Sequence, residues 1–306
     1  MVQINTPCQV IDTHVHFWDP ERVSVPWLSS APHFNERRDG EKYSKEIPNG
    51  VQVRGAVYVE TDVDPRQGLV EADWIAQYAE RLNKTSTAVF GGIAGIVAYA
   101  PVDQGQPVRH YLRLLTQLVP SQRLRGVRYL IQDPSLDPER VAQPPFVEGV
   151  KALGEYNLSF DLNINCNESP AQFPPLIQLV RQCPEITFVL DHMAKPPCDS
   201  HPGEPAFIFW QDNMMALAQF PNVSCKVSGL VTETSTPSAK QLAPFVEVAR
   251  KAFGIDRLMF GGDWPVCENG TRWSKWLEIL AEIVHDWSSQ DKEKLFVTNA
   301  IRIYRL

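Results

Sequence analysis

Charged and histidine side chains follow several short apolar runs of this sequence, at the points where strands of a parallel sheet would end. The first run, residues 9–15, contains His14 and is followed directly by His16. Because side chains alternate along a strand, both imidazoles point to one face, within reach of a single cation or substrate. A His-x-His pair also has structural uses, so the interpretation depends on its place at the end of a first strand. The pair predicts chemistry at that edge of the sheet.

Most of the other apolar runs also end in a charged or histidine side chain. Burying a charge is costly unless the charge is paired or used, so a plain core would not contain these residues. Each of them alone could serve in a salt bridge or a helix cap, but together they indicate one convergent site. In chain order, the residues are Glu60, Arg128, Asp191, His192, Lys195, Lys226, Ser228 and Asp263.

Eight runs with strand character position these side chains, and amphipathic segments with helical spacing lie between the runs. Most runs are continuous apolar stretches, as expected for parallel strands covered on both faces. An eightfold alternation predicts an α/β fold, a closed (β/α)8 TIM barrel, whose reacting groups lie at the C-terminal ends of the strands. The predicted strands are residues 9–15, 53–59, 89–98, 124–130, 158–163, 186–191, 223–228 and 257–262. The predicted helices are residues 68–82, 108–119, 146–156, 173–183, 207–220, 242–254, 271–284 and 291–306.

The composition fits a globular enzyme rather than a nucleic-acid or membrane protein. The chain has 306 residues, and barrels of this length fold as one domain, so we expect a single domain over residues 1–306. A net charge of -7 without a dense Lys/Arg run argues against nucleic acid as a partner. The sequence shows no secretory signal, no apolar run as long as a membrane span and no CxxC pair among its six cysteines, so we expect a cytoplasmic protein with reduced thiols.

The segment between the first two strands, residues 17–50, is long, rich in proline and rich in aromatic residues. It carries Trp18, Trp27, His33 and Phe34. A connection of this length on a compact domain usually has a functional role. We therefore expect this segment to cover the mouth of the active site.

Five motifs, in order, resemble those of the lactonase branch of the amidohydrolase superfamily. They are IDTHVHFWDP followed by PWL, then VLDHMAKP, NVSCKVSGLVTE, MFGGDWPV and NAIRIYRL. The resemblance covers almost the whole chain. It implies a barrel like that of the metal-dependent hydrolases and the hydrolysis of a sugar lactone, such as an L-fucono-, L-rhamnono- or galactono-lactone. It also implies that the metal and catalytic positions are His14, His16, His192 and Asp263.

Departures from the family pattern bear on the metal. Binuclear members carry a bridging lysine at the end of strand four and a histidine at the end of strand five, where this chain has Arg128 and the run FDLNIN. We therefore expect at most one divalent, zinc-like cation, and activity without a metal stays open. Related lactonases often have a histidine after the strand-four arginine, but this chain has Tyr129. The ligands expected for the cation are His14, His16 and Asp263, with Glu60 or His192 as a further donor.

Lactone hydrolysis needs a deprotonated water, a polarised carbonyl and a proton for the departing ring oxygen. We expect Asp263 to be the general base and His192 to be the second catalytic residue, with a cation or the imidazoles stabilising the developing oxyanion. The substrate is then expected to be a small neutral sugar lactone, because only Arg128 is clearly placed to bind a substrate carboxylate. The residues predicted to contact the substrate are Glu60, Arg128, Lys195, Trp27 and Trp264.

Three other functions remain open from the sequence. A decarboxylase of the same superfamily uses a similar His-x-His, His and Asp set on aromatic or unsaturated acids. A phosphodiester or amide hydrolase would normally need a fuller metal cluster. A catalytically silent barrel that acts as a binding module does not explain why ionisable groups gather at the strand ends. The sequence does not choose the sugar or the oligomeric state.

Overall fold

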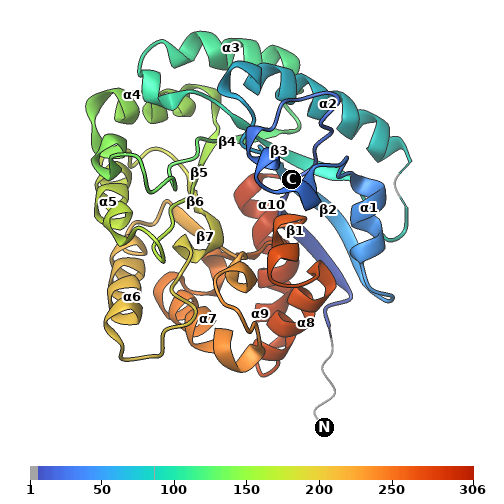
Figure 1. The fold of residues 1–306 in the computed structure, drawn as a ribbon, viewed down its shortest axis with the longest axis vertical. Helices are drawn as coiled ribbons and strands as arrows, with labels where there is room; N and C mark the ends of the chain where they lie inside the picture. The colour runs from blue at the N-terminus through green and yellow to red at the C-terminus, as the bar shows by residue number, and fades with distance from the viewer. Residues whose placement is uncertain (1–5, 86) are drawn as a thin grey trace.

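Eight parallel strands form a barrel in the computed structural model, which describes residues 6–85 and 87–306. Neighbouring strands are paired in chain order from β1 to β8. Figure 1 shows these strands at the centre of the molecule with the helices arranged around them. The predicted (β/α)8 barrel is confirmed. The strands are β1 Gln9–Val15, β2 Gln52–Val59, β3 Ile93–Tyr99, β4 Leu124–Arg128, β5 Ser159–Leu162, β6 Phe188–Leu190, β7 Val223–Val227 and β8 Leu258–Phe260.

Amphipathic helices cover the outside of the barrel with their apolar sides, as the helical spacing predicts. On α6, Met214 is fully buried, which agrees with a packing role for this side chain. The helices are α1 Gly40–Glu46, α2 Gly68–Lys84, α3 Val108–Leu118, α4 Pro144–Ala152, α5 Phe173–Gln182, α6 Pro205–Leu217, α7 Ala239–Phe253, α8 Trp273–Ile283, α9 Ser289–Glu293 and α10 Asn299–Tyr304.

Two predicted elements differ from the structure. The third strand begins at Ile93 rather than at Val89, because Gly92 has a positive φ of 91° that breaks the extended run. The C-terminal helix predicted over residues 291–306 is divided into α9, a π-helical segment Lys294–Thr298 and α10. Figure 1 shows α10 near the centre of the ring of strands, close to the C-terminus.

The barrel closes between β1 and the residues that follow β8. The hydroxyl of Thr13 donates to the carbonyl of Phe260 at 2.7 Å. The backbone N–H of Asp263 donates to the carbonyl of His14, and the N–H of His16 donates to the carbonyl of Trp264, both at 2.8 Å. We call this contact the seam. It forms just where polar residues end both strands.

The connection between β1 and β2 folds into a cap over the barrel mouth. Besides α1 it contains short 3-10 turns at Pro26–Ser29 and Pro32–Phe34. It has a small apolar core of its own, separate from the barrel core, and the guanidinium of Arg38 ties it to Glu268, with N···O distances of 3.0 and 3.2 Å. The core residues are Trp18, Val23, Val25, Leu28 and Phe34 of the cap, together with Val63, which follows β2.

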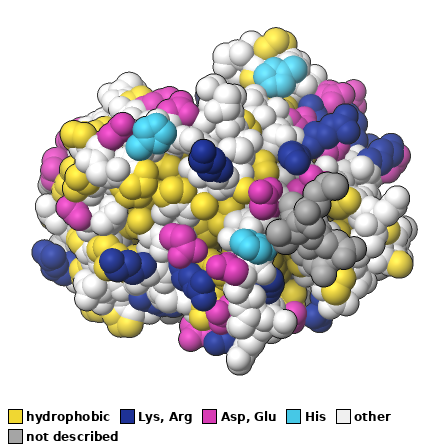
Figure 2. All heavy atoms as spheres, turned by 90° about the horizontal axis from the view of Figure 1, so that it is seen from below, with side chains coloured by type: hydrophobic (Ala, Val, Ile, Leu, Met, Phe, Trp, Pro, Cys, Tyr) yellow, Lys and Arg dark blue, Asp and Glu magenta, His cyan; other side chains and the backbone are white. Residues whose placement is uncertain are grey.

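The surface carries charges of both signs. Figure 2 shows one face of the molecule, on which acidic, basic and hydrophobic side chains are intermixed. Among the described residues, no helix combines the length and the apolar character needed to cross a bilayer.

Candidate active site

The seam brings two histidines and an aspartate together at the C-terminal end of the barrel. The Nε2 atoms of His14 and His16 lie 3.1 Å apart. Asp263 Oδ1 lies 3.8 Å from His14 Nε2 and 3.6 Å from His16 Nε2. All three side chains are buried. The three donor atoms form a triangle of the size that a single metal ion can bridge.

His16 and His192 are each held by a contact at the ring nitrogen Nδ1. His16 Nδ1 lies 2.9 Å from the carbonyl oxygen of Val59, so this nitrogen donates and Nε2 carries a lone pair toward the site. His192 Nδ1 lies 2.9 Å from the hydroxyl of Ser228, and its Nε2 lies 3.9 Å from Asp263 Oδ1. The Nε2 atoms of both rings therefore face the same carboxylate.

Unusual backbone conformations aim two of these side chains. Residues His192, Met193, Ala194 and Lys195 have positive φ angles between 47° and 63°, and Asp263 has a φ of 57°. Residues other than glycine adopt this region at a cost, and functional sites are where such strain is usually kept. The turn after β6 thereby places His192 and Lys195 at the barrel mouth.

Close packing around His192 requires a glycine in the turn after β7. A Cβ atom on Gly229 would lie 2.6 Å from His192 Nδ1, and the φ of Gly229 is 68°. Glycine satisfies both conditions because it has no Cβ. The motif residue Gly229 therefore makes room for the imidazole.

Asp12 anchors the strand ends from below. Its carboxylate accepts hydrogen bonds from the backbone N–H groups of Gly262 at 2.7 Å and His14 at 3.1 Å. It also accepts from the Tyr43 hydroxyl at 2.8 Å and from Trp273 Nε1 at 2.7 Å. A Cβ on Gly262 would come within 2.3 Å of this carboxylate, so the second glycine of MFGGDWPV has a steric cause. Asp12 fixes the backbone on both sides of the seam.

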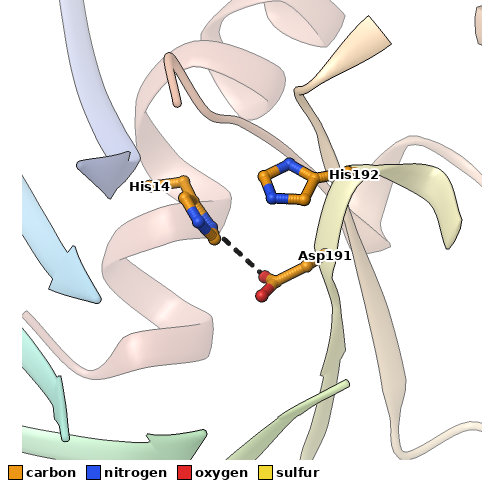
Figure 3. A group of neighbouring side chains, drawn as sticks. All are labelled: His14, Asp191 and His192. Carbon is orange, nitrogen blue, oxygen red and sulfur yellow. Dashed lines mark ion pairs between the residues drawn. The ribbon is translucent and has the colours of Figure 1, made fainter. Parts of the chain in front are cut away.

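A buried ion-pair cluster lies beneath His14. Figure 3 shows Asp191 and His192 beside His14, with the His14–Asp191 ion pair drawn as a dashed line. The Nδ1 atom of His14 lies 3.3 Å from Asp191 Oδ1 and 3.1 Å from Lys226 Nζ. Lys226 Nζ also lies 2.9 Å from Asp191 Oδ1 and 2.7 Å from Asp161 Oδ2. The polar residues of the strands thus form one connected network.

Arg128 belongs to the same cluster. Its Nε donates to Glu60 Oε1 and its Nη2 donates to the carbonyl of Glu60, both at 2.6 Å. Its Nη1 lies 3.6 Å from Asp191 Oδ2. Two carboxylates therefore already compensate the guanidinium charge.

Burial and neighbouring charges shift the pKa values of His14, His192 and Asp263. Burial, the largest influence, lowers the pKa of His14 well below its usual range and lowers that of His192 to about 4, so both rings are neutral at pH 7. Burial alone would raise the pKa of Asp263, but His192, His16 and His14 together outweigh it and hold this pKa below its usual range. The site therefore offers an ionised carboxylate among neutral imidazoles.

In the ion-pair cluster beneath His14, one carboxyl has a raised pKa and the other two groups are firmly charged. Burial raises the pKa of Asp161 to about 6, although Lys226 opposes this shift. For Asp191, the attraction of Lys226 and His14 outweighs burial and holds the pKa well below its usual range. Burial lowers the pKa of Lys226, but the opposing effect of Asp161 and Asp191 is larger, so the pKa is raised overall and the ammonium stays charged.

A cavity of about 350 Å³ opens onto His16, His192 and Asp263. Trp27, Ala31 and Phe34 of the cap form part of its wall, so the segment of residues 17–50 lies over this cavity. Small-molecule sites have this size and this mixture of apolar wall and a few polar groups. The other lining residues are His16, Thr61, Asp62, Arg128, Leu130, Gln132, His192, Lys195, Asp263, Val266 and Asn269.

Most predicted site residues line this cavity, but His14, Glu60 and Trp264 do not. Trp264, predicted to contact the substrate, is 1% exposed and packs against Tyr43 and Phe17, so this prediction is corrected. The indole lies inside because its backbone forms the seam. Glu60, predicted as a substrate contact or metal ligand, is 1% exposed and is occupied by Arg128, so it stabilises that arginine instead.

The structure also places Tyr129 and three aspartates that bear on the sequence-based expectations. Tyr129, which stands where related lactonases often have a histidine, stacks on Tyr99 and donates to Asp103 at 3.2 Å, and it is not part of the cavity wall among the described residues. Sequence reasoning gave no role to Asp191 and did not consider Asp161 or Asp62. Asp161 stands two residues before Asn163 in the FDLNIN run, and only a pattern of inward-facing positions could have singled it out.

Comparisons with known proteins agree with this geometry. The family model described as Amidohydrolase matches residues 11–306. The L-fucono-1,5-lactonase of Burkholderia ambifaria is 27% identical over 304 residues, covering 97% of this chain and 95% of that protein. The L-rhamnono-gamma-lactonase of Scheffersomyces stipitis is 25% identical over 337 residues, covering 97% of this chain and 99% of that protein.

Solved structures share the fold. An amidohydrolase from Burkholderia multivorans, in a crystal form with bound zinc, has a TM-score of 0.80 at 23% identity, with 97% of this chain and 99% of that chain covered. The 2,6-dihydroxybenzoate decarboxylase from Rhizobium has a TM-score of 0.60 at 13% identity, with 97% and 98% covered. At these identities the likeness concerns the fold alone.

Proposed function

This chain belongs to the amidohydrolase family, and we propose that it is a hydrolase that opens the ester ring of a neutral sugar lactone. The observation that carries the proposal is the convergence of His14, His16, His192 and Asp263 at one end of the barrel, where the last three line a cavity and His14 lies directly behind them. Two neutral imidazoles and an ionised carboxylate suit the activation of water beside a carbonyl group. The lactonases among the relatives support the choice of a lactone.

The charges on the cavity wall favour a neutral substrate. The charge of Arg128 is compensated by Glu60 and Asp191, and Lys195 Nζ lies 3.9 Å from Glu233 Oε1. Two carboxylates, Asp62 and Asp263, also line the cavity. A substrate carboxylate would meet no uncompensated side-chain cation here and would be repelled by Asp62. Hydroxyl groups, in contrast, can donate to such carboxylates.

The donor triangle fits one zinc-like cation. A tetrahedral ion with metal–ligand bonds of about 2.0–2.1 Å separates its ligand atoms by about 3.4 Å. The edges between His14, His16 and Asp263 measure 3.1, 3.6 and 3.8 Å. Two imidazole nitrogens and a carboxylate oxygen are ligands that zinc accepts in catalytic sites. We propose His14, His16 and Asp263 as the ligands of one divalent cation.

The charge of the ion-pair cluster supports the same stoichiometry. Together with Asp263, the cluster contains four carboxylates and two cations, so this buried region carries an excess of two negative charges when all of these groups are ionised. One divalent cation would balance them, whereas two such ions would leave an excess of positive charge. The carboxylates are Glu60, Asp161, Asp191 and Asp263, and the cations are Arg128 and Lys226.

Each group then has a distinct task in hydrolysis. A bound cation would supply Lewis-acid polarisation of the carbonyl and lower the pKa of a water molecule. Asp263 accepts the proton of the attacking water and is held for this by the seam. His192 lies beside Asp263 and, being neutral, can accept this proton from Asp263 at Nε2 and pass it to the departing ring oxygen. Arg128 and Lys195 orient the substrate oxygens from the wall.

A substrate panel tests the function. We expect acid release, followed with a pH indicator, from at least one five- or six-membered aldonolactone among a broad set with different hydroxyl configurations. The panel includes lactones that carry a carboxylate, as a control for charge, and aromatic carboxylic acids. Carbon dioxide release from an aromatic acid without acid release from any lactone would assign the decarboxylase alternative. Inactivity on all of them would refute both functions.

A further inference from the structure

The ammonium group of Lys226 has three partners inside the barrel. Its Nζ lies 2.7 Å from Asp161 Oδ2, 2.9 Å from Asp191 Oδ1 and 3.1 Å from His14 Nδ1. The side chain is fully buried, as are those of Asp161 and Asp191. An ammonium group has three N–H donors and no acceptor. Two of these contacts, to Asp161 and to His14 Nδ1, are hydrogen bonds, whereas the contact with Asp191 is an ion pair without hydrogen-bond geometry.

This contact decides where the neutral ring of His14 carries its proton. A ring nitrogen that accepts from Lys226 cannot itself carry hydrogen, so the proton is on Nε2. His14 Nε2–H can then donate to His16 Nε2, 3.1 Å away. His16 in turn donates through Nδ1 to the carbonyl of Val59 at 2.9 Å. These contacts form a continuous chain of hydrogen bonds from Lys226 to Val59.

A second arrangement competes with the first. Asp191 Oδ1 lies 3.3 Å from His14 Nδ1 and has no hydrogen-bond partner among the described residues, so it is available as an acceptor if the proton moves to that nitrogen and the ring turns toward it. The lone pairs of His14 Nε2 and His16 Nε2 then face each other across 3.1 Å, which is unfavourable unless a cation lies between them. A carboxylate that orients a metal-bound histidine in this way is a common arrangement.

We propose that Lys226 is a positioning residue that keeps His14 protonated at Nε2 in the metal-free protein, and that a cation binds only after this proton has moved to Nδ1. The ring keeps one proton in both states. In the second state Asp191 accepts from Nδ1, and Lys226 keeps its hydrogen bond to Asp161 and its ion pair with Asp191. Lys226 therefore lowers the affinity for the cation through the position of a proton as well as through its charge.

The state of the metal-free ring does not depend on which substrate is hydrolysed, and only the cation step rests on the proposed metal site. Histidine tautomers are distinguished by long-range 1H–15N correlation spectra of protein labelled with 15N in its seven histidines. The His14 signals are identified by their loss in His14→Gln. We expect Nε2–H after treatment with a chelator and Nδ1–H after addition of Zn²⁺. A metal-free ring protonated at Nδ1 would overturn the proposal, even if no Lys226 variant folds.

Variants separate hydrogen bonding from charge. In Lys226→Met we expect Nδ1–H without metal and a zinc dissociation constant at least tenfold lower, measured by competition with a chromogenic chelator. Arg128→Met also removes a buried cation beside Asp191 but leaves the donor to His14, so its ring should stay protonated at Nε2. Tyr304→Phe removes only a bond to Asp161 and should change neither readout. A folded Lys226→Met protein that remains protonated at Nε2 contradicts the proposal.

Discussion

The backbone N–H of Asp263 donates a hydrogen bond to the carbonyl oxygen of His14, with an N···O distance of 2.8 Å. The contact that closes the barrel between β1 and β8 therefore also sets the distance between the carboxylate and the histidine pair. Because backbone hydrogen bonds hold both residues, their side chains can meet without a flexible loop between them. Five predictions follow from the geometry around this contact.

Replacing Asp263 by asparagine should keep the fold and remove the proton acceptor. We expect a loss of at least about 10²-fold in kcat with a smaller change in KM, because the interaction strengthens in the transition state. Thermal unfolding and kcat are measured on the same preparation. Asp212→Asn on the exposed side of α6 serves as the control. A folded Asp263→Asn enzyme with near-normal turnover would transfer the role of the base to His192.

Elemental analysis should find at most one divalent cation per chain. The reason is that this chain lacks the bridging lysine expected of binuclear superfamily members at the end of strand four. Arg128 stands there instead and is bound by Glu60. Two equivalents per chain would contradict the prediction. If chelation removes the metal without loss of rate, the imidazoles of His14 and His16 act on the substrate directly.

Arg128→Met should destabilise the protein by about 3–5 kcal/mol, because Glu60 would remain buried without its cation. The double variant Arg128→Met/Glu60→Gln should recover part of this loss, since no unpaired charge remains. Urea unfolding measures both effects. Lys45→Met, in an exposed pair on α1, should leave the midpoint unchanged. A double variant no more stable than Arg128→Met would show that the charge of Glu60 is not the cause.

Asp62 should contribute to the preference for neutral lactones. Its carboxylate lies on the cavity wall, where desolvation and the neighbouring Glu60 raise its pKa to about 6. In Asp62→Asn we expect the ratio of kcat/KM for a carboxylated lactone to that for a neutral lactone to rise by at least about fivefold, because one repulsive charge is removed. Asp286→Asn, which is exposed outside the cavity, is the control. An unchanged ratio would remove Asp62 from substrate selection.

Glu71 should make the protein less stable as the pH rises through neutrality. Burial and Glu60 raise the pKa of Glu71 to about 7, and its Oε1 accepts from the Tyr58 hydroxyl at 2.7 Å. Because the pKa is higher in the folded state than the ordinary 4.5, its contribution is fully present below about pH 4.5 and is lost as the pH rises to about 7.

Glu71→Gln keeps the acceptor and removes the titration. Relative to wild type, its free energy of unfolding should rise by about 3 kcal/mol between pH 4 and pH 8. Urea unfolding at both values measures the difference. Glu278→Gln, on the exposed side of α8, should show no such trend. A constant difference for Glu71→Gln would mean that Glu71 is ionised throughout.

The sequence by itself determined the barrel and the edge of the barrel at which the chemistry occurs. Apolar runs that alternate with amphipathic segments leave few other ways to bury both faces of each strand. Polar residues at the end of a run must lie at the C-terminal edge of the barrel, so His14, His16, Arg128, His192 and Asp263 could be named in advance. The barrel fold and the position of these side chains at its edge therefore follow from the local sequence pattern.

The tertiary structure decided which of these side chains face the cavity and which hold others in place. Glu60 and Trp264 carry the same local signal as true wall residues, but a guanidinium from β4 binds the first and the closing seam buries the second. Lys226 contacts both His14 and Asp161 only because strands far apart in the sequence point into one barrel. Partner choice among buried charges depends on distances between strands, and a one-dimensional pattern contains no such distances.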